Sequence, residues 1–489
     1  MTTPVLVGID LGTTRVKVGL VAPDGTAVGF GRATYDTDVD PATGRAEQDP
    51  DAWWAAIGIA VRGAFAAAAG AHPGVAIEPL GICVAGHGPT LVAVDAAGRA
   101  VRPAITWLDT RSNAERSALE AATGLRGWAL GVAAAARWLE RNEPANADRA
   151  RWYLNTWEAI AFRMTGRAAT SVVPGGQALP RESLRAAGLD IDRLAPDAES
   201  GTVLGELTAE AATDVGLPIG TPIAVGLVDA FASFHGARML GPGDAIDVGG
   251  TAGGFGVYAG RPIEVAGGFT TPAPLPGLHS VGAAMATTGA ALDWLGSEIL
   301  HGSIPTASLL AEARDVPAGA EGLVFLPYLA GERSPLWDPA ARGVFAGLTL
   351  RHTRAHLVRA VLEAAALAIR HVSEPMLAAG IEVSAMRTCG GPARDDGWNQ
   401  IKADVTGFTV EVPRSRETAA VGAAIVAAVG VGAHSDLRTA IAAMTSIDRR
   451  FEPNPAHRAA YDGIYAAYTA LYPAVAPVLR SLRANAVAA

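Results

Sequence analysis

The chain has 489 residues, a formal net charge of −9, 50% hydrophobic residues and 18% charged residues. This length is too great for one core and fits two domains of about 240 residues, and the hydrophobic content excludes global disorder. The negative charge, with basic residues scattered along the chain, argues against a nucleic-acid partner.

The first predicted elements form a strand–turn–strand unit over residues 4–22. "PVLVGIDL" is apolar and rich in β-branched residues, a Gly/Thr turn follows, and "RVKVGLVA" then alternates in polarity. "PDG" at 23–25 predicts a second tight turn. An Asp cap and a Pro in the first turn predict a helix over 49–69, and a strand is predicted over 80–86.

A second copy of the first unit occurs in the other half of the chain. Residues 9–22, "IDLGTTRVKVGLVA", align without a gap on residues 246–259, "IDVGGTAGGFGVYA", so that Asp10 corresponds to Asp247. The offset is close to half of the chain, which favours a duplicated domain over a short repeat. A chance likeness between two Gly-rich hairpins is the alternative.

Strands alternate with helices in both halves, which predicts an α/β sheet in each. In the second half, apolar residues at helical spacing and a Thr cap predict a helix over 353–377. We place the division at "MLGPGD", residues 239–244, just before the second copy. The expected domains are therefore 1–243 and 244–489.

The turn that joins the two strands of the first unit has the chemistry of an anion site. Gly12, Thr13 and Thr14 expose backbone N–H groups and hydroxyls without bulky side chains in the way. Asp10 suits a hydrated Mg²⁺ that carries phosphates, and Lys17 is a cation for the same group. Two such hairpins on facing domains would hold a nucleotide triphosphate from both sides. The alternative is a plain hairpin in which Asp10 caps the turn and Lys17 is a solvated side chain.

Cysteine and lysine are both rare in this chain. Cys83 and Cys389 lie in apolar contexts without metal-ligand spacing, which predicts a reducing, cytoplasmic compartment. The N-terminus has no basic segment and apolar runs such as 419–433 are short and Gly-rich, so we expect a soluble protein without a signal peptide. Of the 39 basic residues only Lys17 and Lys402 are lysines, a bias that we attribute to genome composition.

Longer motifs carry a resemblance to a known family. "GIDLGTT" and its second copy resemble the phosphate-binding loops of the actin, heat-shock chaperone and sugar kinase superfamily. "GVFAGLTLRHTRAHLVRAVLE" at 343–363 is similar, position by position, to the C-terminal signature of the FGGY carbohydrate kinases. Segments 325–343, 102–111 and 389–407 are also typical of that family. The resemblance spans nearly the whole chain and is nearest to the xylulokinase-like members.

The resemblance implies a fold, cofactors and an activity. The fold would be α/β, with two duplicated actin-like, ribonuclease H-like domains around a central cleft. The first domain would bind a sugar and carry the catalytic base near its end, and the second would bind ATP with Mg²⁺. His356 and Glu363 of the C-terminal signature are seven residues apart on one helix face, and we interpret them as packing residues rather than catalytic ones.

Matching positions then give the expected site residues. Asp229 in "VGLVDAFASFHGARM" corresponds to the general base, with a simple helix cap as the alternative. Asp10 would coordinate Mg²⁺ through water. Asp293 is as easily explained as an exposed helix residue. The implied nucleotide contacts are Gly12, Thr13, Thr14, Lys17, Thr251, Gly289, Asp293, Gly390, Gly391 and Asp395.

The sugar side departs from the family pattern. Xylulokinases carry Gln-Met-His where this chain has His87, Gly88 and Pro89. Either His87 replaces the missing imidazole, or the sugar differs, or His87 is a buried, merely hydrogen-bonded residue. The amide that usually follows the base is replaced by Ala230, and Trp-Glu at 157–158 stands where Asp-Tyr is common.

Three further residues are candidates for the sugar pocket, namely Trp107, Asp109 and Arg111. An indole face suits C–H surfaces and charged groups suit hydroxyls. The alternative is an Arg–Asp pair that braces the end of a strand. Gln48 is a weaker candidate, because the start of the following helix explains its neighbourhood.

The function predicted from these features is ATP-dependent phosphorylation of a small sugar, with D-xylulose as the first choice and D-xylulose 5-phosphate as product. Another ketose or a polyol, such as ribulose, erythritol or a glycerol-like compound, is the alternative within this class. A catalytically degenerate sugar sensor and an actin-like ATPase are the alternatives outside it. The expected partners are a sugar and ATP, without nucleic acid or membrane, and a homodimer is left open.

Overall fold

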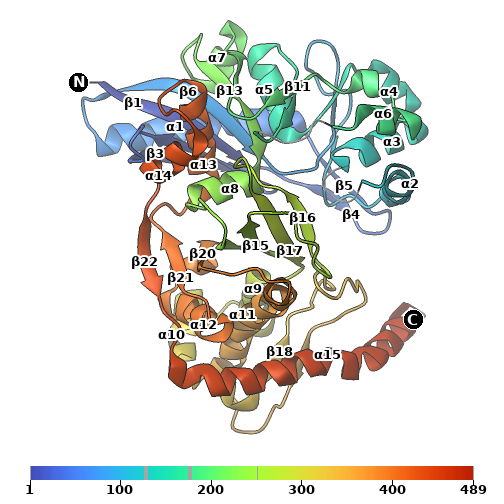
Figure 1. Ribbon diagram of the computed structural model, residues 1–489, viewed down its shortest axis with the longest axis vertical. Helices are drawn as coiled ribbons and strands as arrows, with labels where there is room; N and C mark the ends of the chain where they lie inside the picture. Colours follow the sequence, from blue (N-terminus) through green and yellow to red (C-terminus); the bar gives the residue numbers. More distant parts are fainter. Residues whose placement is uncertain (1, 126–129, 175–178, 251, 488–489) are drawn as a thin grey trace. The chain divides into compact units, whose positions relative to one another are not determined.

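The computed structural model describes residues 2–125, 130–174, 179–250 and 252–487, and the chain divides into two compact units (Figure 1). Unit 1 consists of Met1–Leu240, Ala273–Gly277 and Glu417–Ser446. Unit 2 consists of Gly241–Pro272, Leu278–Arg416 and Ile447–Ala489. The main segment of unit 1 ends close to the expected division of 1–243 from 244–489. The structure differs from that division at Glu417–Ser446, which packs with unit 1.

Unit 1 is built on a six-stranded sheet with the order β12-β13-β6-β1-β2-β3. Strands β1, β6 and β13 run parallel, while β2, β3 and β12 are antiparallel to their neighbours. The strands are β1 (Thr2–Leu11), β2 (Arg15–Val21), β3 (Ala27–Thr34), β6 (Ala76–Gly86), β12 (Val203–Glu206) and β13 (Pro222–Val228). The strand–turn–strand unit and the later strand predicted from sequence are therefore confirmed as β1, β2 and β6.

Helix α1 (Pro50–Ala71) covers one face of this sheet and confirms the predicted helix. The Asp49 side chain accepts a hydrogen bond from the N–H of Asp51 at 2.9 Å, as an N-cap does. Among the described helices only α1 is long and apolar enough to cross a membrane by length and composition. Trp53 and Ile57 on this helix are fully buried in the core of unit 1.

Helix α13 (Thr418–Gly430) explains why a late segment of the chain belongs to unit 1. The helix is apolar almost throughout and lies against β1, β6 and α8 (Asp229–Gly236) (Figure 1). Glycines allow backbones to approach closely here: a Cβ on Gly8 would lie 1.9 Å from the carbonyl oxygen of Ala420. A Cβ on Gly422 would lie 1.8 Å from the carbonyl oxygen of Ala232. The contact is thus specified at several positions.

Smaller elements complete unit 1 and form a second core cluster under the loops. The remaining helices are α2 (Asn113–Thr123), α3 (Ala133–Asn142), α4 (Pro144–Arg149), α5 (Thr156–Thr165), α6 (Arg181–Ala186), α7 (Ala209–Val215) and α14 (Leu437–Met444). The short strands are β4 (Asp38–Asp40), β5 (Arg45–Gln48), β7 (Val92–Val94), β8 (Ala104–Ile105), β9 (Trp152–Leu154), β10 (Thr170–Val172) and β11 (Asp197–Glu199).

Unit 2 repeats the plan in a seven-stranded sheet with the order β16-β17-β15-β14-β20-β21-β22. As in unit 1, the first strand pairs antiparallel with its hairpin partner on one side and parallel with a later strand on the other. The strands are β14 (Asp244–Gly249), β15 (Gly253–Ala259), β16 (Phe269–Pro272), β17 (His279–Met285), β20 (Ala385–Gly390), β21 (Val410–Pro413) and β22 (Ile447–Phe451), with β18 (Val324–Leu326) and β19 (Val344–Ala346) in a separate pair.

The helices of unit 2 include the one predicted over 353–377, which is α11 (Arg354–Ala378) and begins with Thr353 and His356 in a capping box. Glu363 on α11 is buried and accepts hydrogen bonds from Arg359 at 2.7 Å and Tyr461 at 3.0 Å. Both signature residues thus make structural contacts. The other helices are α9 (Gly289–Trp294), α10 (Thr306–Arg314), α12 (Asp396–Thr406) and α15 (Arg458–Val487).

Candidate active site

Charged side chains gather at the turn of the first hairpin in unit 1. Asp10, near the end of β1, is buried and faces Lys17, its cross-strand partner on β2, with Nζ 3.6 Å from Oδ2. Lys17 Nζ also lies 2.9 Å from Oε2 of Glu417, the residue before α13. Asp229 is the first residue of α8, after the N-cap Val228. Lys17 thus joins Asp10 and Glu417, and Asp229 lies close enough to Asp10 and Lys17 for both charges to act on its carboxyl group.

The ionisation of Asp229 is set by this surrounding. Burial, and then the negative charge of Asp10, raise the pKa of Asp229 to about 7, against the smaller lowering effects of the Ala230 N–H and Lys17. Burial also raises the pKa of Asp10, while Lys17 lowers it. A carboxylate that titrates near neutral pH can accept a proton during a reaction and release it afterwards.

Tyr35 supports the turn and was missed from the sequence. Its hydroxyl donates to the carbonyl oxygen of Gly12, and its backbone N–H donates to the carbonyl oxygen of Thr14 at 3.4 Å. Burial and the charges of Asp10 and Asp229 raise the pKa of Tyr35, so its hydroxyl stays protonated. Its position directly after β3, the strand next to the hairpin, is the signal that could have indicated it.

Thr13 is held by two side chains from different elements. The amide of Gln48, a buried residue on β5, donates to the carbonyl oxygen of Thr13 at 2.7 Å. The indole N–H of Trp107 donates to the hydroxyl of Thr13 at 3.1 Å. Trp53 Nε1 donates to Gln48 Oε1 at 3.2 Å and so fixes the amide. The hairpin turn and the expected sugar-side residue Trp107 are therefore in direct contact.

His87 lies at the end of β6, next to this network. Its ring is only 1% exposed, Nδ1 lies 3.1 Å from the hydroxyl of Thr90, and Nε2 has no hydrogen-bond partner among the described residues. Burial lowers the pKa of His87 to about 3, so the imidazole is neutral. This geometry corresponds to the buried, hydrogen-bonded alternative, and a direct contact with a sugar stays a prediction.

Two departures from the family pattern meet in space. A Cβ on Gly88 would lie 2.9 Å from the ring of Trp157 and 3.3 Å from Oδ1 of Asn155. The indole of Trp157 therefore occupies the space in which a side chain at position 88 would lie. Gly88 and Trp157 therefore pack directly against each other.

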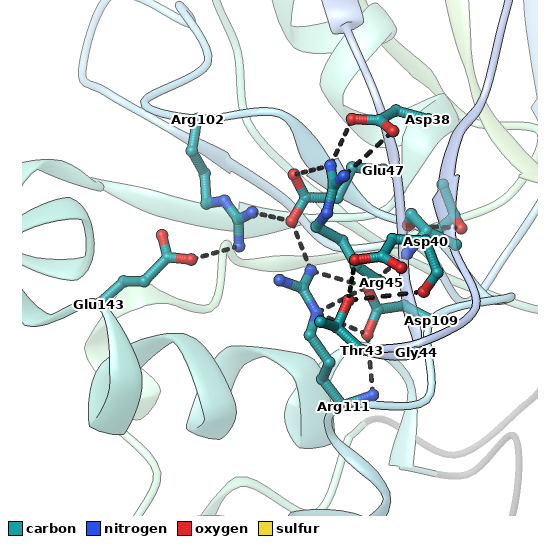
Figure 2. Close-up of polar contacts among 12 residues, drawn as sticks. Asp38, Asp40, Thr43, Gly44, Arg45, Glu47, Arg102, Asp109, Arg111 and Glu143 are labelled. Atoms are coloured by element: carbon teal, nitrogen blue, oxygen red, sulfur yellow. Dashed lines mark hydrogen bonds and ion pairs between the residues drawn. The ribbon is translucent and has the colours of Figure 1, made fainter.

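Asp109 and Arg111 belong to a buried ion network, which Figure 2 shows. The guanidinium of Arg111 binds both oxygens of Asp109, with Nε at 3.1 and 3.0 Å. Asp109 also accepts from the N–H of Ala46 at 2.9 Å, and Glu47 is bound by both Arg102 and Arg111. The pair thus braces β5 and the loop after β8. This arrangement corresponds to the alternative of a structural Arg–Asp pair at the end of a strand.

Two of the residues of unit 2 that are expected to contact the nucleotide lie on closely packed backbone. Gly390 has a φ of +81°, and a Cβ there would lie 1.9 Å from the carbonyl oxygen of Gly249. Gly289 N–H donates to the carbonyl oxygen of Gly250 at 2.9 Å, and a Cβ on Gly289 would lie 2.5 Å from that oxygen. Glycines at these positions thus allow the ends of β14 and β20 and the start of α9 to pack closely together. Thr251, expected between β14 and β15, lies outside the described residues.

The other expected nucleotide contacts of unit 2 have mixed surroundings. Gly391 is exposed, and a Cβ there would meet open space. Asp395 is the N-cap of α12: it accepts from the N–H of Trp398 at 2.8 Å and pairs with Arg314 at 2.6 Å. Asp293 is exposed on α9. Their roles in nucleotide binding stay predictions.

Comparison with known proteins defines the family to which these sites belong. The N-terminal domain of the FGGY family of carbohydrate kinases matches residues 5–236, and the C-terminal domain of that family matches residues 247–431. The chain belongs to the FGGY family of carbohydrate kinases. Membership of this family makes the chain a sugar kinase, and FGGY kinases use ATP as the phosphate donor.

Individual FGGY relatives differ in the sugar that their names give. A xylulose kinase of Escherichia coli is 29% identical over 97% of this chain and 99% of its own length. A gluconokinase of Bacillus subtilis is 28% identical over 88% of both chains. The crystal structure of a xylulose kinase from Rhodospirillum rubrum, at 33% identity, covers 97% of this chain and 99% of that one with a TM-score of 0.81. The expected fold of duplicated actin-like, ribonuclease H-like domains is thereby confirmed.

Proposed function

We propose that this FGGY kinase transfers the γ-phosphoryl group of ATP to D-xylulose and forms D-xylulose 5-phosphate. The relatives that carry the name xylulose kinase include one at 31% identity over 88% of this chain, from Klebsiella pneumoniae. The structure from Rhodospirillum rubrum carries the same name, and the structure from Brucella ovis is named a xyloylose kinase. These names support a ketopentose as the acceptor.

The observation that carries the proposal is the position and ionisation of Asp229. Its pKa of about 7 leaves the carboxylate available above neutral pH, beside Asp10 and Lys17. In the proposed reaction an Asp229 oxygen accepts the proton of the sugar hydroxyl while that hydroxyl oxygen attacks the γ-phosphorus in line. The bond from phosphorus to the bridging oxygen of ATP breaks, and ADP leaves. Asp229 then returns its proton to solvent.

The first hairpin suits a metal-bound triphosphate. Among the described residues no three or more His, Cys, Asp or Glu side chains form a group that could hold a metal ion. Mg²⁺ bound to nucleotide needs only one or two carboxylates besides water and phosphate oxygens, so the buried carboxylate of Asp10 fits it. When bound, the metal neutralises phosphate charge. Lys17 and the hydroxyls of Thr13 and Thr14 would hold the β- and γ-phosphates.

The acceptor side would be formed by residues whose supports are visible in unit 1. Trp107 is 38% exposed and its indole N–H is fixed by Thr13, so one face of the ring is available for the C–H surface of a sugar. Asp109 and Arg111 would act through the loop that they brace. In unit 2, Gly289, Gly390, Gly391 and Asp395 would contribute to the nucleotide site, with Asp293 and Thr251 as further proposed contacts.

Two observations favour a different acceptor. Trp157 occupies the space next to Gly88, where xylulokinases have a side chain, and a gluconokinase is nearly as similar as the xylulose kinase of Escherichia coli. A sugar acid, another ketose or a polyol is therefore the alternative acceptor.

A coupled ADP-release assay across ketoses, polyols and sugar acids tests the proposal. The acceptor with the highest kcat/KM identifies the substrate, and we expect D-xylulose. Asp229→Asn should still bind nucleotide and lose nearly all acceptor-dependent ADP release. Turnover by this variant at the wild-type rate would exclude Asp229 as the base. Sugar binding without ADP release would indicate a sensor, and ADP release independent of any acceptor would favour an ATPase.

A further inference from the structure

The two lysines of the chain occupy equivalent chemical positions in the two units. Of 39 basic residues only these two are lysines, and the rest are arginines. Lys17 pairs with Asp10 of the first hairpin, and Lys402 pairs with Asp247 of the second. Asp10 and Asp247 are the residues that correspond in the duplicated sequence. A chain that uses arginine almost everywhere else thus keeps an ammonium group beside each hairpin aspartate.

The second pair is formed by a different route from the first. The residue of the second copy that aligns with Lys17 is Gly254, which has no side chain. The ammonium for Asp247 is supplied instead by Lys402, from α12, whereas Lys17 belongs to the hairpin itself. The same charge contact has thus been built twice from unrelated parts of the fold.

The surroundings of Lys402 are fully enclosed. Lys402 and Asp247 are each 2% exposed, and Thr388 on β20 is 0% exposed. Lys402 Nζ donates to Asp247 Oδ2 and to the hydroxyl of Thr388 at 2.8 Å, and that hydroxyl donates to Asp247 Oδ2 at 3.2 Å. By contrast, the Lys17 side chain is 31% exposed and is shared with Glu417. Lys17 is therefore accessible to a ligand, whereas the ammonium of Lys402 is enclosed and binds Asp247 and Thr388.

The enclosed triad lies immediately behind the glycines of the nucleotide side. Asp247 is two residues before Gly249 at the end of β14, and Thr388 is two residues before Gly390 at the end of β20. The two strands run parallel and pair Asp247 with Thr388 and Gly249 with Gly390. A shift of either strand would therefore change the close packing of the Gly249 and Gly390 backbones, where a Cβ on residue 390 would lie only 1.9 Å from the carbonyl oxygen of Gly249.

An ammonium suits this position better than a guanidinium. It is compact and has three donors that can point to different acceptors, while a guanidinium is a planar fork that needs more space. At 2% exposure a guanidinium at this position could not extend into solvent and would have to fit within the packed interior. A neutral residue would leave the Asp247 carboxylate buried without its charge partner.

We propose that Lys402 is a positioning residue for nucleotide binding, which fixes Asp247 and Thr388 so that the paired ends of β14 and β20 keep the backbone geometry required by phosphate or ribose groups. This inference rests on the proposed function, because it assigns nucleotide binding to unit 2. It adds a residue that contacts no ligand and acts through two strand ends.

The test is the affinity for ADP, measured by isothermal titration calorimetry with Mg²⁺ and without acceptor. Lys402→Arg and Lys402→Met should each weaken ADP binding at least tenfold, while the KM for the acceptor changes less than twofold. Arg458→Lys, at the exposed ion pair with Asp462, is the matched control for exchanging the two cations and should bind ADP like the wild type. All measurements are made well below the unfolding temperature of each variant.

Two further variants keep the test decisive if the single variants fold poorly. Asp247→Asn/Lys402→Met removes both charges together and should recover the melting temperature but not the ADP affinity. Thr388→Val removes only one hydroxyl and should weaken ADP binding about threefold. Wild-type ADP affinity in Lys402→Arg or in the double variant would overturn the inference and leave the proposed function intact. Absence of ADP binding by the wild type would instead overturn the proposed function.

Discussion

The ionisation of Asp229 predicts how the reaction rate depends on pH. Only the carboxylate form accepts the hydroxyl proton, so kcat/KM should rise as the pH increases through the pKa of about 7. With that pKa, roughly one tenth of the enzyme carries the ionised base at pH 6 and roughly nine tenths at pH 8, which gives about a tenfold rise. An Asp with an ordinary pKa would be almost fully ionised throughout this range and would give a flat profile.

The measurement is the initial rate of ADP release at subsaturating acceptor and saturating ATP with Mg²⁺, from about pH 5.5 to 9. Asp229→Asn, assayed in parallel, defines the rate without a base and should show no rise across this range. Asp10→Asn removes the second cause of the raised pKa, so any residual activity should reach its half-maximum at lower pH. A wild-type profile that is flat between about pH 6 and 8 would refute the argument that a neutral-range carboxylate is the base.

Three other predictions concern stability and packing. Because the pKa of Asp229 is raised in the folded state, folding favours the protonated form of this residue, and the free energy of unfolding falls as the pH rises from about 4 to 7. Asp229→Asn should therefore raise the melting temperature more at pH 8 than at pH 5. Gly88→Ala should lower the free energy of unfolding by about 1–3 kcal/mol in chemical denaturation, because its Cβ would lie 2.9 Å from the ring of Trp157. If Gly88→Ala lowers the free energy of unfolding equally in a Trp157→Phe background, the contact with Trp157 is not the cause. Gly8→Ala should cost at least about 3 kcal/mol, because the obstacle is the backbone oxygen of Ala420 at 1.9 Å and cannot rotate away; an unchanged urea midpoint would disprove the close approach.

Local patterns made the framework of the fold predictable. Each hairpin is formed by consecutive residues, with a Gly/Thr turn between its strands. The strands β1 and β2 and the duplication could therefore be recognised without tertiary information. The start of α1 was equally predictable, because the Asp49 cap and the following Pro act within one turn. Asp229 was indicated by the resemblance to the FGGY kinases, because the local pattern alone fits a helix cap equally well, and its role as the base stays a prediction.

The missed residues are those whose partners are distant in sequence. Nothing near Lys17 indicates that Glu417 will lie 2.9 Å from its ammonium, and nothing near Asp247 indicates Lys402. The rarity of lysine is visible in the sequence, but genome composition explains it there equally well. The contact between Gly88 and the ring of Trp157 could likewise not be predicted, because a glycine in the sequence does not indicate which side chain packs against it.

The return of Glu417–Ser446 to unit 1 has a consequence for how the protein is synthesised. Helix α13 covers β1 through contacts that include Gly8, yet it is translated after most of unit 2, of which only Ile447–Ala489 follows it. A ribosome must therefore release most of the chain before the first-made sheet acquires its last covering helix, and residues 1–243 expressed alone would leave apolar strand surface uncovered. The natural place to divide this protein for biochemical work is thus not the midpoint that its duplicated sequence suggests.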